Sequence, residues 1–70
     1  MLRNSIISTS IAVIGYDPNQ LTLEIEFLEG IIYRYFDIPV SVYLNLVNAS
    51  SRGRFFNYYI KPFYKYNREN

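Results

Sequence analysis

The chain has 70 residues and a formal net charge of +1, and half of its residues are hydrophobic. A chain this short forms one domain, over residues 1–70, and buries only roughly 60% of the surface that its unfolded form exposes. The sequence contains neither cysteine nor histidine, which excludes disulfides and argues against zinc, so no metal or other cofactor is expected. Stability must then come from the eight tyrosines and five phenylalanines and from self-association. We therefore expect a homo-oligomer.

The N-terminal segment carries no pattern of export or membrane insertion. Residues 1–10 are interrupted by asparagine, serine and threonine, so they lack the apolar stretch of a signal peptide. No run approaches the ~18 apolar residues of a membrane span. These features predict a cytoplasmic protein with no membrane partner.

The charged residues are distributed unevenly. Residues 1–51 carry two basic and five acidic residues, whereas residues 52–68 carry five basic residues and no acid. Such asymmetry favours an anionic partner. Two solvated faces, or an interface between subunits, would explain it equally well.

Three segments in the first half of the chain have the pattern of β-strands. The clearest is Leu21 to Phe27, where apolar residues alternate strictly with Thr22, Glu24 and Glu26, as in a half-buried strand. The β-branched segments Ile11 to Tyr16 and Ile31 to Phe36 flank it. The turn residues of 17–20 and 29–30 separate the three segments, which predicts an antiparallel meander.

Helical spacing begins after Pro39, which cannot donate to a sheet but suits the start of a helix. The apolar residues that follow share one helix face up to Val47. Ser51 can cap a second short helix, which ends before Pro62. The tail 63–70 is expected to be mostly irregular, although Phe63, Tyr64 and Tyr66 indicate that part of it packs against the domain. The predicted fold class is α+β: a three-stranded antiparallel β-meander followed by two short helices packed on one face.

Short motifs follow one another in a specific order along the chain. They are Ile14-Gly15-Tyr16-Asp17, the strand Leu21 to Phe27, Tyr33-Arg34-Tyr35, Ile38-Pro39, Val42-Tyr43, Ala49, Ser51-x-Gly53, Phe55-Phe56-Asn57, Ile60-Lys61 and Tyr64. Over about residues 5–66 this order resembles the KTSC domain, a module named for the C-terminus of some lysyl-tRNA synthetases and also found as stand-alone bacterial and phage proteins. The resemblance implies RNA binding, through the synthetase context. The chain departs from the family pattern at Pro62 and Phe63, where charged or polar residues are common.

The sequence argues against an enzyme. It has no histidine or cysteine, no glycine-rich phosphate loop and no serine in a nucleophile motif, so a general base would have to be a carboxylate or lysine. Glu24 and Glu26 form the only paired carboxylates on a strand, and the alternation places them on its solvent face. We expect a non-catalytic binding protein.

Tyr33 and Tyr35 project to the same face of the third strand, with Arg34 on the opposite face. On an open face, the two rings could stack on successive bases, as in RNA-binding sheets. On the face covered by helices, they belong to the core and bring only their hydroxyls to its rim. We favour the core interpretation, because the apolar residues of 21–27 must share a buried layer.

A basic and aromatic segment carries the main binding hypothesis. Guanidinium groups bind phosphates in a bidentate manner, and aromatic neighbours supply stacking surface. Helical spacing places Arg54, Asn57, Tyr58 and Lys61 on one side of the second helix, and Arg52 precedes them. The alternative is an ordinary solvated amphipathic helix.

The predicted ligand-binding residues are thus Arg52, Arg54, Asn57, Tyr58, Lys61, Tyr33 and Tyr35. Two ligands fit their chemistry: RNA, which the family resemblance favours, and a small signalling nucleotide that an oligomer sequesters in a pocket between subunits. A third hypothesis is a protein–protein interaction module that uses exposed aromatic residues and a sheet edge.

Overall fold

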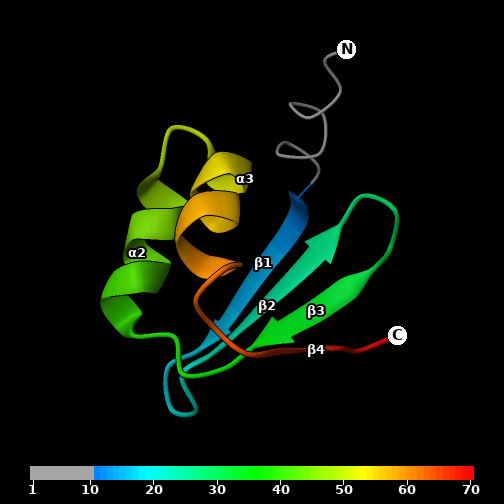
Figure 1. The fold of residues 1–70 in the computed structure, drawn as a ribbon, viewed down its shortest axis with the longest axis horizontal. Helices are drawn as coiled ribbons and strands as arrows, with labels where there is room; N and C mark the ends of the chain where they lie inside the picture. Colours follow the sequence, from blue (N-terminus) through cyan, green and yellow to red (C-terminus); the bar gives the residue numbers. More distant parts are fainter. Residues whose placement is uncertain (1–10) are drawn as a thin grey trace.

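A computed structural model describes residues 11–70 and confirms the α+β class. Four strands form one antiparallel sheet in the order β1-β2-β3-β4, and the helices cover one of its faces (Figure 1). The elements are β1 (Ile11–Asp17), β2 (Thr22–Phe27), β3 (Ile32–Tyr35), α2 (Val40–Asn48), α3 (Arg52–Phe55), the π-helical turn η1 (Phe56–Ile60) and β4 (Tyr66–Arg68). The expected absence of a signal peptide, and the start of the domain core near residue 5, fall outside the described residues.

The three predicted strands form the meander expected from their alternation. Leu23 lies opposite Tyr35, and Ile25 lies opposite Tyr33, so these four side chains project to the face that the helices cover. Glu24 and Arg34 face each other on the opposite side. The alternating pattern therefore gave the correct face for the residues of β2, and the core interpretation favoured for Tyr33 and Tyr35 places them on the correct face of β3.

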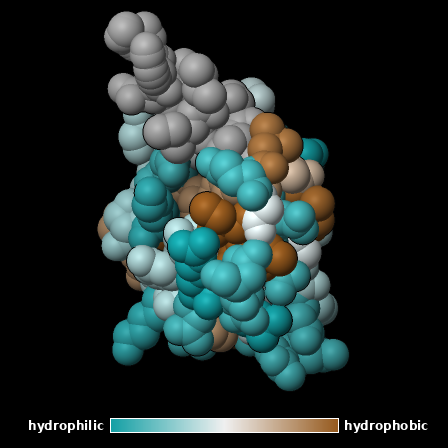
Figure 2. All heavy atoms as spheres, turned by 90° about the vertical axis from the view of Figure 1, so that its right-hand side faces the viewer, coloured by the Kyte–Doolittle hydropathy of each residue, from teal (hydrophilic) through white to brown (hydrophobic). Residues whose placement is uncertain are grey.

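Both hairpin turns use the residues that the sequence indicated. The backbone N–H of Asn19 donates to Asp17 Oδ1 at 2.9 Å, which fixes the first turn. Gly30 adopts a φ of 91°, a conformation that glycine reaches without steric cost. From the side of this second hairpin, the surface is mostly hydrophilic around a small group of hydrophobic residues (Figure 2).

The prediction of an irregular tail is wrong for residues 66–68. β4 pairs with β3 in antiparallel register, with Tyr66 opposite Tyr35 and Arg68 opposite Tyr33. Beyond the strand, Asn70 accepts from the Ile32 N–H at 3.0 Å and donates to the Gly30 carbonyl at 2.6 Å. The free edge of β3 and this side-chain clamp hold the tail in an extended conformation.

The second helix is not a continuous α-helix. Ser51 caps α3 as predicted, its Oγ accepting from the Arg54 N–H at 3.2 Å. The chain then widens into η1, where the Lys61 N–H donates to the Phe56 carbonyl at 2.9 Å, a bond that spans five residues. The wider turn changes the relative positions of side chains before and after it. No helix within 11–70 is long and apolar enough to cross a membrane.

The core lies between the sheet and the helices. Its members are fully or almost fully buried: Leu23, Ile25, Tyr35, Ile38, Leu46, Phe56 and Ile60. Partly buried aromatic side chains extend this core on two sides, toward Tyr43 on α2 and toward Tyr33 on the sheet. The second extension forms the candidate functional site.

Tyr16 joins the sheet to the segment before α2. Its hydroxyl donates to the Ile38 carbonyl at 2.6 Å, and its ring stacks on Tyr43 with centroids 4.4 Å apart. Burial, and secondarily the carboxylate of Asp17, raise the pKa of the Tyr16 hydroxyl.

We expect Tyr16→Phe to lower the free energy of unfolding by more than Tyr58→Phe does, because it leaves the Ile38 carbonyl without its donor. Urea denaturation monitored by circular dichroism measures this loss. Tyr58→Phe is the matched control, since Tyr58 is exposed and its hydroxyl makes no hydrogen bond within residues 11–70. An equal effect of the two substitutions would contradict the role of the Tyr16 hydroxyl.

Candidate functional site

A small hollow opens where the sheet meets η1, with a volume of about 90 Å³. Five aromatic side chains and two polar ones line it: Phe27, Tyr33, Tyr35, Phe56, Tyr66, Asn57 and Lys61. We call this the aromatic pocket. Pockets that enclose a drug-sized ligand measure about 300 Å³ or more. The aromatic pocket can therefore receive only a part of a ligand, such as one planar ring.

The five rings of the aromatic pocket form a closed circuit of contacts. The centroid distances are 5.8 Å for Phe27–Tyr33, 5.4 Å for Tyr33–Tyr66, 5.2 Å for Tyr66–Tyr35, 5.2 Å for Tyr35–Phe56 and 6.0 Å for Phe56–Phe27. Four of the contacts are edge-to-face, and only Tyr35 and Tyr66 stack. Such packing keeps each ring in one orientation, so the walls of the pocket are formed in the absence of a ligand.

Four elements supply these residues. The alternation of β2 and β3 directs Phe27, Tyr33 and Tyr35 to the helix-covered face. The pairing of β4 with β3 brings Tyr66 to the same face. The remaining wall comes from η1, where Phe56 is buried against the rings of Phe27 and Tyr35.

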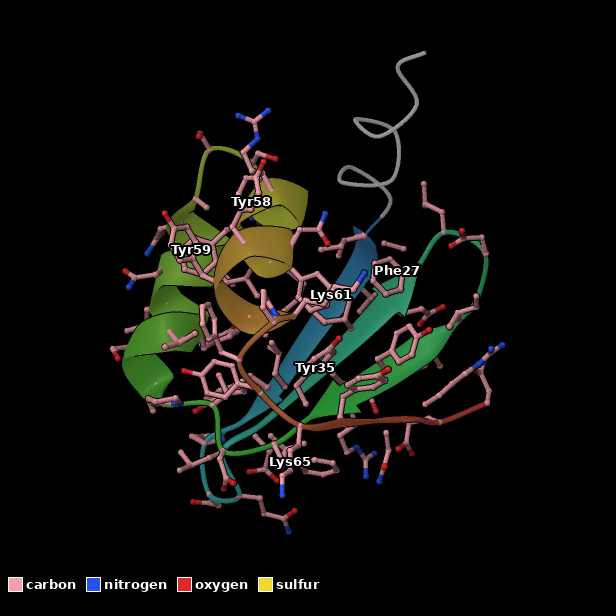
Figure 3. The ribbon with its side chains drawn as sticks, viewed as in Figure 1. Phe27, Tyr35, Tyr58, Tyr59, Lys61 and Lys65 are labelled. Atoms are coloured by element: carbon pink, nitrogen blue, oxygen red, sulfur yellow. The ribbon has the colours of Figure 1, made fainter. Side chains whose placement is uncertain are left out.

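The polar groups of the pocket lie at its edge. Asn57 is partly buried and Lys61 is exposed, and Lys61 lies over the sheet beside Phe27 and Tyr35 (Figure 3). No carboxylate belongs to the lining. Burial, and then the neighbouring hydroxyls of Tyr66 and Tyr33, raise the pKa of Tyr35 to about 12. The pocket is thus neutral and apolar inside, with the positive charge of Lys61 at its mouth.

The structure brings together four of the seven predicted ligand-binding residues. Tyr33, Tyr35, Asn57 and Lys61 all line the aromatic pocket. Tyr35 is buried, as the core interpretation predicted, and its ring faces the pocket rather than solvent.

The other three residues lie outside the aromatic pocket. Arg52 donates from Nε and Nη2 to the Val47 carbonyl, at 3.4 Å each, and lines a separate hollow beside β1. Arg54 and Tyr58 are exposed, and Tyr58 lies away from the pocket (Figure 3). The predicted basic side of the second helix therefore contributes Asn57 and Lys61 to the aromatic pocket, while Arg54 and Tyr58 remain predicted ligand-binding residues outside it.

Three walls of the pocket were not predicted as site residues: Phe27, Phe56 and Tyr66. The alternation of β2 already placed Phe27 on the face of Tyr33 and Tyr35, so this residue could have been included. The aromatic character of Tyr66 indicated that the tail packs down, but not where, since its position depends on a strand that the sequence pattern did not indicate.

The two strand glutamates considered as catalytic groups lie on the open face of the sheet. Glu24 pairs with Arg34 at 3.2 Å, and Arg34 also contacts Glu69 at 3.7 Å. Exposed pairs of this kind contribute little to stability. The ion pair with Arg34 accounts for Glu24 as a surface residue of the sheet.

Comparisons with known proteins identify relatives over most of the chain. The KTSC domain family model matches residues 7–66. An uncharacterized protein of Stutzerimonas stutzeri is 45% identical over 62 residues, covering 89% of this chain and 87% of the relative. A lysine–tRNA ligase of a Nostoc species is 45% identical over 51 residues, but these are 73% of this chain and only 9% of the ligase. The crystal structure of a KTSC domain protein from Yersinia pestis is similar with a TM-score of 0.84 and 37% identity, covering 89% of this chain and 87% of that one.

Proposed function

Since the chain belongs to the KTSC domain family, we propose that it is a non-catalytic module that binds RNA by taking one unstacked base into the aromatic pocket. The observation that carries the proposal is the closed circuit of five rings with Asn57 and Lys61 at its edge. Aromatic side chains bind the faces of single-stranded bases. The relatives that are lysine–tRNA ligases support RNA as the ligand class.

The polar groups at the edge match the remaining parts of a nucleotide. The Asn57 amide offers both a donor and an acceptor, which suits the edge of a base. Lys61 offers a positive charge to a phosphate, which would stay at the surface because the hollow is too small for a whole nucleotide. The face of the base would thus meet the aromatic rings, its edge would meet the Asn57 amide, and the phosphate would meet the Lys61 ammonium group.

An aromatic cage can also bind a quaternary ammonium group. Such cages attract cations through the negative faces of their rings, and a nearby positive charge opposes that attraction. Lys61 lies at the mouth of the pocket, and no carboxylate offsets its charge there. This arrangement favours an anionic ligand with an aromatic ring over a cationic one.

We expect Lys61→Glu to weaken the binding of single-stranded RNA by roughly tenfold or more, because it replaces a phosphate contact with a repulsive charge. Fluorescence anisotropy with a labelled oligoribonucleotide of mixed sequence measures the change. Arg54→Glu alters the net charge equally and is exposed, but lies outside the lining. We expect its effect to be below about twofold.

The control also locates the site. If Arg54→Glu weakened binding as much as Lys61→Glu, the ligand would lie on the basic segment that begins at Arg52, and the aromatic pocket would not be its site. If the unmodified protein bound no RNA at low salt, the proposal would be wrong.

A second candidate, a small nucleotide held between subunits, draws support from a different surface. Large apolar side chains on and after the helices are exposed, with Tyr58 at 63%, Tyr59 at 59% and Phe63 at 72%. Side chains of this kind are common in subunit interfaces. Native mass spectrometry would support this function if it found a defined oligomer with the added mass of a nucleotide, and an empty monomer would contradict it.

A further inference from the structure

Arg68 is a second cation on the face of the aromatic pocket. It lies directly opposite Tyr33 in the pairing of β3 with β4, and directly opposed residues project to the same face of a sheet. Tyr66, two residues earlier on β4, lies on that face as well and contacts the ring of Tyr33. The exposed side chain of Arg68 therefore emerges beside the aromatic pocket.

The backbone of Arg68 is held firmly on both sides. Tyr66 packs on Tyr33 and Tyr35 before it. After it, the Glu69 N–H donates to the Ile32 carbonyl at 2.8 Å, and Asn70 clamps the β2–β3 hairpin. Glu69 pairs with Arg34 on the opposite face of the sheet, so its carboxylate does not neutralise Arg68.

Two cations thus lie on this face of the sheet: Lys61, which follows η1 and lines the aromatic pocket, and Arg68, which lies outside the lining on the edge strand β4. On the proposed function of base binding in the aromatic pocket, we infer that the site takes an internal nucleotide of a single strand, with Lys61 holding one flanking phosphate and Arg68 the other. A free mononucleotide has a single phosphate group and can satisfy only one of the two cations.

The same geometry disfavours a duplex. A base can enter the pocket only after it has left its stack and its pair, which costs a few kcal/mol in a duplex and little in a flexible single strand.

Two phosphate contacts also predict a weak dependence of RNA binding on salt, with a slope of log K against log salt of about −1.4 for a single strand.

The test compares two ligands and three variants. The ligands are the nucleoside 5′-monophosphates and the corresponding homotrinucleotides, in which the central nucleotide has a phosphate on each side. The variants are Lys61→Glu, Arg68→Glu and the control Lys65→Glu, whose exposed side chain lies away from the pocket (Figure 3). Isothermal titration calorimetry gives the affinities, and circular dichroism confirms that each variant is folded.

We expect Arg68→Glu to weaken trinucleotide binding roughly tenfold while changing mononucleotide binding by less than about twofold. Lys61→Glu should weaken both ligands, and Lys65→Glu neither. Arg68→Glu should also make the salt slope for the trinucleotide shallower by about 0.7.

Two results would overturn the inference while leaving base binding intact: Arg68→Glu weakens the binding of both ligands equally, or it changes the binding of neither. Failure of the unmodified protein to bind any of these ligands would instead overturn the proposed function itself. The two failures are therefore distinguishable.

Discussion

Phe56→Ala will lower the free energy of unfolding by about 3–5 kcal/mol. The Phe56 side chain is 2% exposed, and its ring contacts Tyr35 at 5.2 Å and Phe27 at 6.0 Å. Removing the ring takes away the aromatic contacts between η1 and the sheet and leaves a cavity, although the buried Ile60 of η1 still packs in the core. For a domain of this size, such a loss is comparable to its whole stability, so the variant will be largely unfolded near physiological temperature.

Urea denaturation of a graded series measures this effect. Phe56→Leu keeps part of the apolar volume and should lose less than Phe56→Ala, which provides a value even if the alanine variant does not fold. Phe63→Ala removes an equal ring that is 72% exposed, and we expect it to change stability by less than about 0.5 kcal/mol. Equal losses at positions 56 and 63 would show that the ring of Phe56 does not join the two layers.

The sequence was most informative where a strand has one buried face. The alternation of β2 predicted its register, and with it the face of Tyr33 and Tyr35, because a shift by one residue would bury Glu24 and expose Leu23. The turn chemistry of Asp17 and Gly30 then fixed the hairpins. These features are local, so a pattern of a few residues is sufficient to read them.

The parts that the sequence did not reveal depend on tertiary contacts. β4 has only three residues, all exposed, so it shows no apolar alternation. Its extended conformation depends on the open edge of β3 and on the Asn70 clamp. The π-helical turn has no signature in residue type either, and it separates Arg54 from Lys61.

The strand β4 decides which part of the candidate site was predictable. The alternation of side chains along β3 indicated that Tyr33 and Tyr35 share a face. The spacing of four residues between Asn57 and Lys61 indicated that these two lie on the same side of a helix. Tyr66 and Arg68 require β4, a strand that the sequence pattern did not indicate. The predicted residues therefore contained Tyr33, Tyr35 and both polar residues of the aromatic pocket, but not the wall that Tyr66 forms on β4.

Above pH 10, the protein will lose stability through the titration of Tyr35. Its pKa rises from the ordinary value of 10.0 to about 12 in the folded protein, chiefly because the side chain is buried. Below pH 10 the hydroxyl is protonated in both states, so it causes no pH dependence. Between pH 10 and 12 the unfolded chain releases this proton while the folded chain retains it, and the unfolded state is favoured. Because one pKa unit corresponds to about 1.4 kcal/mol and solvent screening reduces the effect, the loss is at most about 2–3 kcal/mol across this range.

Tyr35→Phe isolates this contribution from the other titrating groups. Tyr16 also has a raised pKa, but its contribution is common to the two proteins. Urea denaturation at pH 9, 10, 11 and 12 should therefore give a shallower decline for Tyr35→Phe, with the difference between the proteins growing as the pH rises. Parallel declines would mean that the Tyr35 hydroxyl exchanges its proton equally well in both states. The aromatic pocket would then be open to water at its base, and a planar ligand would find a wet surface there instead of an apolar one.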